Sequence, residues 1–242
     1  MEAPGRSLLS RPMILDHKER GNIVIHPFRE KSVNTTSYDV RLGLYYYSEE
    51  QRGHGSNIFN PFDEVHVRRH WNGPHRGENA GEWMDRTSQH LENIKRDDTI
   101  IPLGPGQTIL AHTQEFIGGR HCIGQEMRAR SSMGRIGITV CKCAGWGDIG
   151  YVNRWTMEVT NVLQEHSITL VVGMRVAQLI FFEADPLDAS YASEQGKYQT
   201  TDDMERLISS WSPESMLPKL YKDYELREGF PKQEDREAPI LT

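Results

Sequence analysis

The sequence predicts an all-β domain, either a distorted β-barrel or a jelly roll. Short segments with alternating apolar and polar residues recur along the chain, for example at residues 107–116 and 155–161. Glycine and proline clusters such as residues 102–106 separate these segments. No convincing long helical pattern occurs before residue 202. Many short strands joined by turns are typical of barrels and jelly rolls.

The composition predicts one globular domain with additions. The chain has 242 residues, and a domain commonly holds ~100–200. Hydrophobic residues make up 37%, charged residues 26%, and the net charge is −6. This balance argues against a general nucleic-acid surface, so we expect no nucleic-acid partner. Any phosphate site must be local and built from a few arginines and lysines.

The cysteines and the apolar runs indicate a cytoplasmic protein. The three cysteines are an odd number, and no signal-like apolar segment begins the chain, so we expect reduced thiols. The longest apolar candidate, residues 168–182, is interrupted by Gly173, Arg175 and Gln178 and falls short of the ~20 residues that cross a bilayer. We therefore expect no membrane contact.

The amino-terminal third predicts a frayed start and two strands. Residues 1–12 are rich in proline, glycine and serine, which gives little reason for fixed structure. A short helix could end at residues 16–20, before a strand at residues 23–25. Residues 37–47 predict the next strand. Within it, Asp39 and Arg41 could form an ordinary ion pair or belong to a site.

Residues 49–98 predict a central insertion on the barrel, since the alternation gives way to glycine, histidine, asparagine and charge. His66 and His70 have the spacing of metal ligands on one helix face. However, two arginines stand between them and no HExxH glutamate is present, so a solvated surface is the better prediction. Trp71 and Trp83 indicate that the insertion packs against something, such as a neighbouring subunit.

The carboxy-terminal part predicts a β-hairpin and then an extension. Residues 167–172 and 175–183 flank Gly173-Met174, as the strands of a hairpin would. We expect a main domain at residues 1–200 and an extension at residues 201–242. In the extension we predict a short helix at residues 202–210, capped by Thr201 or Asp202, and disorder after Pro231.

Residues 128–161 hold the densest set of chemical groups. Residues 130–137 place two guanidinium groups and two hydroxyls around glycines, which suits phosphate oxygens. In residues 155–161, Trp155, Met157 and Val159 should face one side of a strand, and Glu158 the other. Taken on its own, Glu158 is better interpreted as a charge on the exposed face of a strand, because charged residues are mostly exposed.

These residues resemble the dCTP deaminases of the dUTPase superfamily. The shared pattern is RSSxxRxG, AGW, an aspartate, a glycine followed by an aromatic residue, and T-hydrophobic-E-hydrophobic-x-N. Residues 21–28, 37–43 and 105–115 resemble further family signatures. The resemblance covers roughly residues 10–50 and 100–200, leaving the insertion and the tail outside it. It implies a dUTPase-like barrel, a homotrimer and sites between subunits.

The resemblance also implies a deamination without a protein-bound metal. Zinc deaminases use an HxE and PCxxC set, which this sequence lacks. In the implied mechanism Glu158 shuttles a proton, and the Ser131 hydroxyl and Ala144 carbonyl position water. Arg135 orders the site and neutralises developing charge. Burial would raise the pKa of Glu158 into a useful range.

The nucleotide-binding residues follow from the same resemblance. Mg²⁺ is expected as a cofactor that arrives with the substrate phosphates, because this ion prefers phosphate oxygens and water to a protein cage. The phosphate contacts are expected from residues scattered over the motif and the segment after residue 190. The full substrate-binding set is Arg130, Ser132, Asp148, Tyr151, Gln178, Tyr191 and Lys197.

Three positions depart from the family pattern. Ile149 is bulkier than usual beside the pyrimidine pocket, and Asn153 replaces a glycine. Asparagine tolerates the left-handed backbone, so the turn could survive. Thr201 replaces a glutamine expected to close over the phosphates. We expect these changes to hurt phosphate chemistry more than ring chemistry, since small positioning errors slow a reaction strongly.

The sequence therefore predicts a hydrolase that deaminates dCTP to dUTP and ammonia, using a deoxynucleotide triphosphate as substrate. The nearest alternative is a bifunctional enzyme that releases dUMP and pyrophosphate, and the next is a dUTPase. A trimeric nucleotide-binding regulator is the alternative without catalysis. The presence of Ser131, Arg135 and Glu158 argues against the regulator, because a pure binder has little use for a poised carboxylate.

Overall fold

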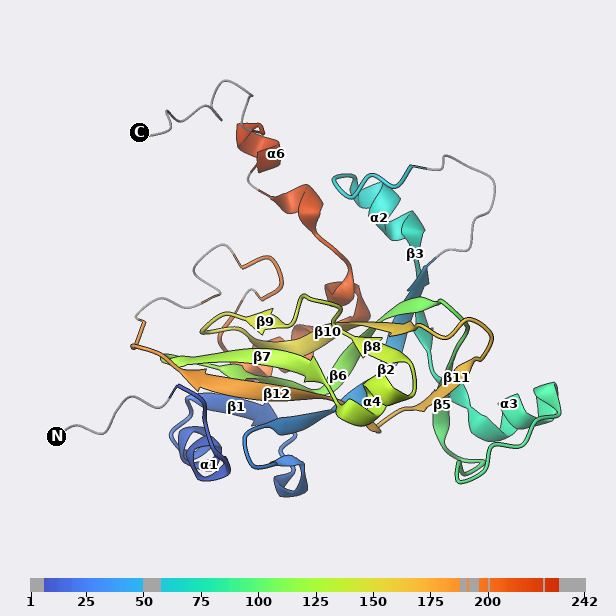
Figure 1. Cartoon of the computed structure of the whole chain (residues 1–242). Helices are drawn as coiled ribbons and strands as arrows, with labels where there is room; N and C mark the ends of the chain where they lie inside the picture. Colours follow the sequence, from blue (N-terminus) through green and yellow to red (C-terminus); the bar gives the residue numbers. More distant parts are fainter. Residues whose placement is uncertain are drawn as a thin grey trace, which may run out of the picture.

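The computed structural model describes residues 7–49, 58–187, 191, 196–199, 201–223 and 225–230. It confirms the all-β prediction, because a curled antiparallel sheet of nine strands forms the body of this part of the chain (Figure 1). Seven strands follow the order β8-β10-β6-β2-β12-β7-β9, while β1 pairs with β6 and β3 with β2. A second sheet has the order β11-β5-β4.

The strands are short and lie between turns, as predicted. They are β1 Ile23–His26, β2 Tyr38–Glu49, β3 Trp71–Arg76, β4 Glu78–Asn79, β5 Thr99–Leu103, β6 Thr108–Gly119, β7 Ile123–Ala129, β8 Ile138–Val140, β9 Trp146–Gly147, β10 Val152–Asn161, β11 Ile168–Val171 and β12 Arg175–Glu183. The α-helices are α1 Arg11–Glu19, α2 Glu64–His70, α3 Ala80–Thr87, α4 Ser131–Arg135, α5 Met204–Ser210 and α6 Glu225–Glu228.

The main core lies on the inner face of the curled sheet. In β10, buried and partly exposed residues alternate from Trp155 to Asn161, which confirms the predicted strand and its two faces. Met157 stands opposite Ala111 of β6, and Val159 stands opposite Ile109. Residues opposite each other on neighbouring strands share a face, so these four side chains enter the same core. Glu158 consequently lies on the outer face.

The amino-terminal segment is more ordered than predicted. Leu9 is fully buried, and its backbone N–H donates to the Phe181 carbonyl at 3.0 Å. Leu8 forms a bridge with Phe182, and α1 begins directly afterwards at Arg11. The prediction of a frayed start is therefore wrong for residues 7–12, because the buried Leu9 and the backbone bridge at Leu8 tie this segment to β12. Residues 1–6 lie outside the described part.

The predicted hairpin at residues 167–183 has the right strands but the wrong pairing. β11 pairs with β5 in the small sheet, whereas β12 pairs with β2 and β7 in the large one. Gly173, at φ +88°, donates its N–H to the Leu42 carbonyl, and Leu42 donates to the Met174 carbonyl. The turn is thus bonded to β2 and carries the chain from one sheet to the other. β7 is a strand that the sequence analysis missed.

The insertion packs against its own chain. β3 pairs with β2, and Trp71 packs beside Tyr47 and Leu110. Trp83 packs near Met84 and Ile100 in a separate cluster. Both tryptophans therefore pack against residues of their own chain. His70 stacks on Phe59 at 4.4 Å, and His66 lies 3.8 Å from Asp63, so the two histidines serve local contacts on α2, as the solvated-surface prediction expects.

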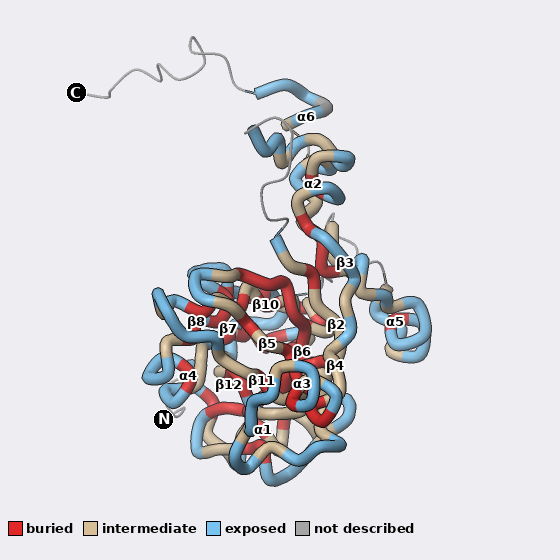
Figure 2. The backbone as a smooth tube through the Cα atoms, turned by 90° about the vertical axis from the view of Figure 1, so that its right-hand side faces the viewer, coloured by how far each residue is buried: buried red, intermediate tan, exposed pale blue. Residues whose placement is uncertain are grey.

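The carboxy-terminal extension covers the outer face of β2 and β6. Met216 and Leu217 join the cluster of Tyr47, Trp71 and Leu110, and Trp211 packs at its edge. The helix predicted at residues 202–210 is present as α5, but its cap is Asp203, whose carboxylate accepts from two backbone N–H groups. α2 and α6 project from the same side of the body (Figures 1 and 2). The predicted disorder after Pro231 lies outside the described residues.

No helix within the described ranges is long and apolar enough to cross a membrane.

Candidate active site

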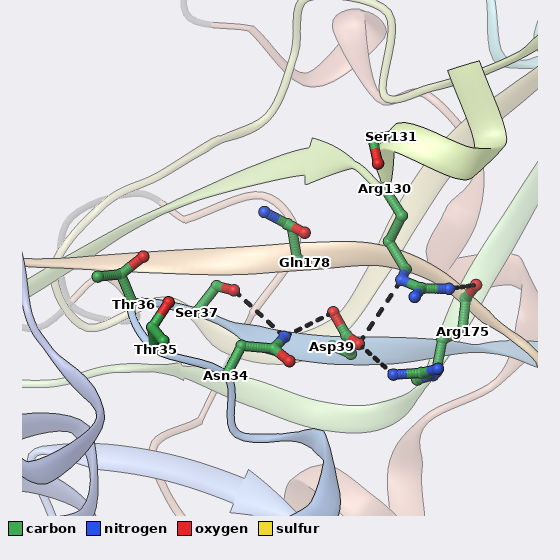
Figure 3. A pocket seen from close by; sticks show the side chains of 9 residues that line it. All are labelled: Asn34, Thr35, Thr36, Ser37, Asp39, Arg130, Ser131, Arg175 and Gln178. Carbon is green, nitrogen blue, oxygen red and sulfur yellow. Dashed lines mark hydrogen bonds and ion pairs between the residues drawn. The ribbon is translucent and has the colours of Figure 1, made fainter. Parts of the chain in front are cut away.

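A polar pocket of about 290 Å³ opens beside α4, between the segment before β2 and strand β12. It brings together three of the predicted site residues, namely Arg130, Ser131 and Gln178 (Figure 3). The remaining lining residues are Asn34, Thr35, Thr36, Ser37, Asp39 and Arg175. The lining is rich in hydroxyl and guanidinium donors, which suits the oxygens of a phosphate chain.

Asp39 organises the charges of this pocket. Its carboxylate is almost fully buried and accepts from Arg175 Nη1 at 2.8 Å and from Asn34 Nδ2 at 2.9 Å. Arg130 Nε lies 3.6 Å from the same carboxylate (Figure 3). One buried carboxylate thus holds two guanidinium groups at the pocket wall, leaving further N–H donors for a ligand.

Asp39 and Arg41 are not partners of each other. Arg41 is buried beside Glu115 instead, with its Nε donating to the carboxylate at 2.6 Å and its backbone N–H donating at 3.0 Å. The interpretation of Asp39 and Arg41 as an ion pair is therefore wrong, and Asp39 belongs to the pocket. Arg175 was not predicted at all, because its contact with Asp39 joins residues 136 positions apart.

The short helix α4 presents the RSSxxR motif outward. Met133 is buried in the main core and anchors the helix. Ser131, Ser132 and Arg135 are exposed around it. Of these three, Ser131 lines the pocket, and Ser132 and Arg135 do not. The structure therefore places the motif at the surface, with one hydroxyl inside the polar pocket and the others facing outward.

Glu158 lies in a different environment. One carboxylate oxygen, Oε2, is buried without a hydrogen-bond partner in the described part of the chain. Burial raises the pKa of Glu158, against the opposing effects of its own backbone N–H and the Lys142 ammonium. An unpartnered buried carboxyl held toward its neutral form is the arrangement that a proton shuttle needs.

The turn after β8 is strained beside Glu158. Cys141 and Lys142 both have positive φ, at 62° and 37°. The Cys141 N–H donates to the Glu158 carbonyl at 3.1 Å, and the Cys141 carbonyl accepts from Ala144 at 2.7 Å. Two consecutive non-glycine residues in the left-handed region cost free energy and commonly mark functional sites. This turn carries Ala144, whose carbonyl was predicted to position water.

A third group gathers Asp148, Tyr151 and Tyr191. The Tyr151 ring packs edge-on against Trp155 at 5.4 Å and against Tyr191 at 5.1 Å. Burial raises the pKa of Tyr191, and the nearby Asp148 carboxylate raises it further. Asp148 accepts from Trp146 Nε1 at 3.1 Å, which fixes its orientation. These predicted substrate-binding residues do lie together.

Lys197 is held by the carboxy-terminal extension. Its ammonium pairs with the Asp223 carboxylate, and its carbonyl accepts from Lys219 Nζ at 3.1 Å. The neighbouring Gln199 is buried, accepts from the Val152 N–H at 2.7 Å and donates to the Gly150 carbonyl. The segment after residue 195 therefore lies beside the start of β10, near the tyrosine group.

Asn153 does not use the left-handed backbone that was expected of it. It is a strand residue of β10, opposite Ile117 of β6. Its amide donates to the Tyr198 carbonyl at 2.8 Å, and its side-chain oxygen accepts from the Arg154 N–H. Gly150, at φ +92°, supplies the positive φ of this turn. The turn before β10 is therefore formed with Gly150, and not Asn153, in the left-handed conformation.

A single chain does not bring the Ser131 pocket and Glu158 into one cavity. Glu158 stands opposite Leu110 of β6, which stands opposite Tyr47 of β2. The pocket is lined by Asp39, which lies eight residues earlier on β2. Glu158 is not among the residues that line the pocket. Ser131 in the pocket and Glu158 on β10 therefore belong to separate groups within one chain.

Comparison with known proteins identifies the family. The family model described as dCTP deaminase-like matches residues 8–184. A "dCTP deaminase, dUMP-forming" of Methanobrevibacter smithii is 30% identical over 225 residues, which is 91% of this chain and 99% of the relative. A protein of the same name from Halobacterium salinarum is 30% identical over 199 residues, covering 81% and 91%.

Solved structures of the same kind also align. The 2'-deoxycytidine 5'-triphosphate deaminase of Agrobacterium tumefaciens covers 74% of this chain and 48% of its own, with 17% identity and a TM-score of 0.46. An EIAV dUTPase covers 40% of this chain and 81% of its own, with 22% identity and a TM-score of 0.31. On the family match over residues 8–184, the chain belongs to the dCTP deaminase-like family.

Proposed function

We propose that this protein deaminates dCTP at C4 of the cytosine ring, with Glu158 as the group that moves the proton. The observation that carries the proposal is the buried, unpartnered Oε2 of Glu158, together with its raised pKa. A carboxyl in this state can take a proton from water and return it to a leaving amine, because burial makes its neutral form easier to reach.

The other catalytic roles would fall to Ala144, Ser131 and Arg135. Water attacks C4 and loses a proton to Glu158, which then protonates the amine so that ammonia leaves. The strained turn at Cys141 and Lys142 fixes Ala144, whose carbonyl would accept a hydrogen bond from that water. The Ser131 hydroxyl would position the water from the other side, and Arg135 would offset developing negative charge.

A homotrimer with sites between chains reconciles these roles with the separation of the groups. Ser131 lines a pocket that Glu158 does not line, and Ser131, Ser132 and Arg135 are exposed on α4. We infer that α4 of one subunit is presented to the Glu158 group of the next. A heterologous interface repeated three times closes into a ring and completes three equivalent sites.

The polar pocket suits the triphosphate. Arg130 and Arg175 present guanidinium groups held by Asp39, and Ser131 adds a hydroxyl. Because Asp39 is occupied by two arginines and Asn34, it is a poor ligand for a metal ion. Mg²⁺ would instead bind the phosphate oxygens of the substrate and neutralise part of their charge. Lys197 would contact the same phosphates after leaving Asp223.

We infer that the product is dUMP with pyrophosphate, the alternative that the sequence analysis placed second. The curated relatives are named dUMP-forming, which supports this order. The replacement of a glycine by Asn153 was an argument against the phosphate step. This argument loses its basis, because Gly150 makes the turn and Trp146 orients Asp148. Asp148 would hold a second water in line with the leaving pyrophosphate. Ile149 and Thr201 remain departures from the family pattern.

Early product analysis tests this proposal. Labelled dCTP and Mg²⁺ are mixed with excess unlabelled dUTP, the reaction is quenched at early times, and the products are separated. Labelled dUMP should appear without a lag and without labelled dUTP. Asp148→Asn should accumulate labelled dUTP, and Glu158→Gln should leave dCTP intact. If labelled dUTP accumulates before labelled dUMP in the wild type, the released product is dUTP and the inference of dUMP is wrong.

Two rival functions give different outcomes in the same experiment. A plain dUTPase would convert dUTP and leave dCTP untouched. A nucleotide-binding regulator would bind dCTP without releasing ammonia. Either result with a folded trimer would reject deamination, whereas release of ammonia at a rate that depends on Glu158 would support it.

A further inference from the structure

His17, Cys122 and Glu183 converge at the end of the large sheet beside α1. One potential ligand atom of each residue lies within 4.8 Å of the other two. His17 and Cys122 are buried, and Glu183 reaches the surface. The cluster joins three elements: α1, which packs beside β1 (Figure 1), the turn between β6 and β7, and the last residue of β12.

Backbone hydrogen bonds hold each of the three residues in place. The carbonyl of His17 accepts from the Asn22 N–H at 2.9 Å. The carbonyl of Cys122 accepts from Ala184 at 2.8 Å, directly after Glu183, and the Glu183 N–H donates to the Ser7 carbonyl at 2.8 Å. The side chains therefore converge from a rigid frame, as a preorganised metal site requires.

The distance between His17 and Glu183 suits two ligands of one ion better than a direct hydrogen bond. His17 Nε2 lies 3.6 Å from Glu183 Oε1, longer than a direct N–H···O hydrogen bond of about 2.9 Å. Zinc ligands at about 2.0–2.3 Å in tetrahedral geometry stand roughly 3.3–3.7 Å apart. Asn22 lies 3.2 Å from His17 Nδ1 and 4.0 Å from Cys122 Sγ.

We propose that His17, Cys122 and Glu183 bind a zinc ion that fastens α1 to the sheet. A thiolate, an imidazole and a carboxylate together select zinc over magnesium, which prefers oxygen ligands alone. A water at the exposed Glu183 side would complete four-fold coordination. On binding, the Cys122 thiol releases its proton to solvent and the sulfur bonds to the metal; no electron transfer is involved.

This site is separate from the proposed deaminase chemistry. Glu183 lies five residues beyond Gln178 on β12, about 16 Å at 3.3 Å per residue. The sequence analysis expected no protein-bound metal, because the three ligands are far apart in the chain and follow no spacing motif. The proposed zinc is structural and does not enter the reaction at Glu158.

Cobalt binding to the full-length protein tests the proposal. The protein is stripped with a chelator, kept reduced and titrated with Co²⁺, because a cobalt–thiolate bond absorbs in the near ultraviolet. We expect one Co²⁺ per chain with this absorption, displaced by Zn²⁺. Cys122→Ser should lose the band, and the matched control Cys143→Ser, at an exposed cysteine, should keep it. His17→Gln and Glu183→Gln should weaken Zn²⁺ binding at least ~10-fold.

Circular dichroism and nucleotide binding establish that each variant is folded. The proposal is overturned if the folded wild type shows no thiolate band at millimolar Co²⁺, or if the band persists in Cys122→Ser. It is also overturned if the band disappears in Cys143→Ser while Cys122→Ser retains it. A zinc affinity unchanged in both folded glutamine variants would show that the imidazole and the carboxylate are not ligands.

Discussion

Acidification should destabilise the protein through His112, a buried histidine of β6. Its Nδ1 lies 2.8 Å from the Thr113 carbonyl, and its Nε2 accepts from the Tyr45 N–H at 3.2 Å. The pKa of His112 is lowered from 6.5 to about 4, mainly by burial; the hydrogen bond to the Thr113 carbonyl opposes this shift, and the Arg154 charge contributes to it. Protonation would remove the acceptor for Tyr45 and bury a second positive charge beside Arg154.

The size and sign of the effect follow from this pKa. A change from 6.5 to about 4 corresponds to about 3 kcal/mol, at roughly 1.4 kcal/mol per unit of pKa. Because the folded pKa is the lower one, the unfolded chain binds more protons between pH 4 and 6.5. The free energy of unfolding contributed by His112 is therefore fully present above pH 6.5 and is lost as the pH falls to about 4.

Urea unfolding from pH 4.5 to 7.5 measures this contribution. Carboxyl groups titrate in the lower part of this range, so the informative quantity is the difference between wild type and His112→Gln. The variant should be less stable at neutral pH and should lack most of the pH dependence. His166→Gln, at an exposed histidine, is the matched control and should keep it. Equal slopes in wild type and His112→Gln would refute the reasoning.

Three further predictions concern the site and the sheet. Glu158→Gln should keep nucleotide binding but reduce ammonia release at least ~100-fold. Because burial raises the pKa of Glu158 above 4.5, this variant should also gain stability over wild type as the pH rises above 4.5. Gly43→Ala should cost about 1–3 kcal/mol in urea unfolding, since a Cβ there would lie 2.1 Å from the His112 ring, while Gly134→Ala meets no neighbour within 4 Å and should be nearly neutral. Deamination below the melting temperature should survive a zinc-selective chelator when Mg²⁺ is replenished, and loss of turnover in the folded, zinc-free protein would contradict this.

Local patterns in the sequence predicted those structural features that depend only on residues close together in the chain. The alternation around Glu158 gave β10 and the face on which this carboxylate lies, because side chains of a strand alternate by geometry alone. The motif that begins at Arg130 gave two members of the polar pocket, Arg130 and Ser131. These features rest on a few consecutive residues, which a sequence displays directly.

Pairings between distant segments were not predictable in the same way. Backbone hydrogen bonds to Leu42 hold the turn at Gly173, and no residue near Gly173 in the sequence indicates these bonds. Arg175 and Asp39 meet across the pair of β2 and β12, although they are 136 residues apart in the chain. The cap of α5 shifted to Asp203 because its carboxylate reaches two N–H groups at once. Such choices depend on geometry that forms only after the chain has folded.

The cluster of Tyr47, Trp71, Leu110, Met216 and Leu217 has a consequence for how this protein is divided into parts. Val67 and Trp71 come from the insertion, and Met216 and Leu217 come from the extension, so the two segments outside the family resemblance share one apolar core. Phe62 and Phe230 also meet, at 5.5 Å. The insertion and the extension are thus one accessory body, and a chain shortened after residue 200 would uncover an apolar face of β2 and β6 and not merely lose a tail.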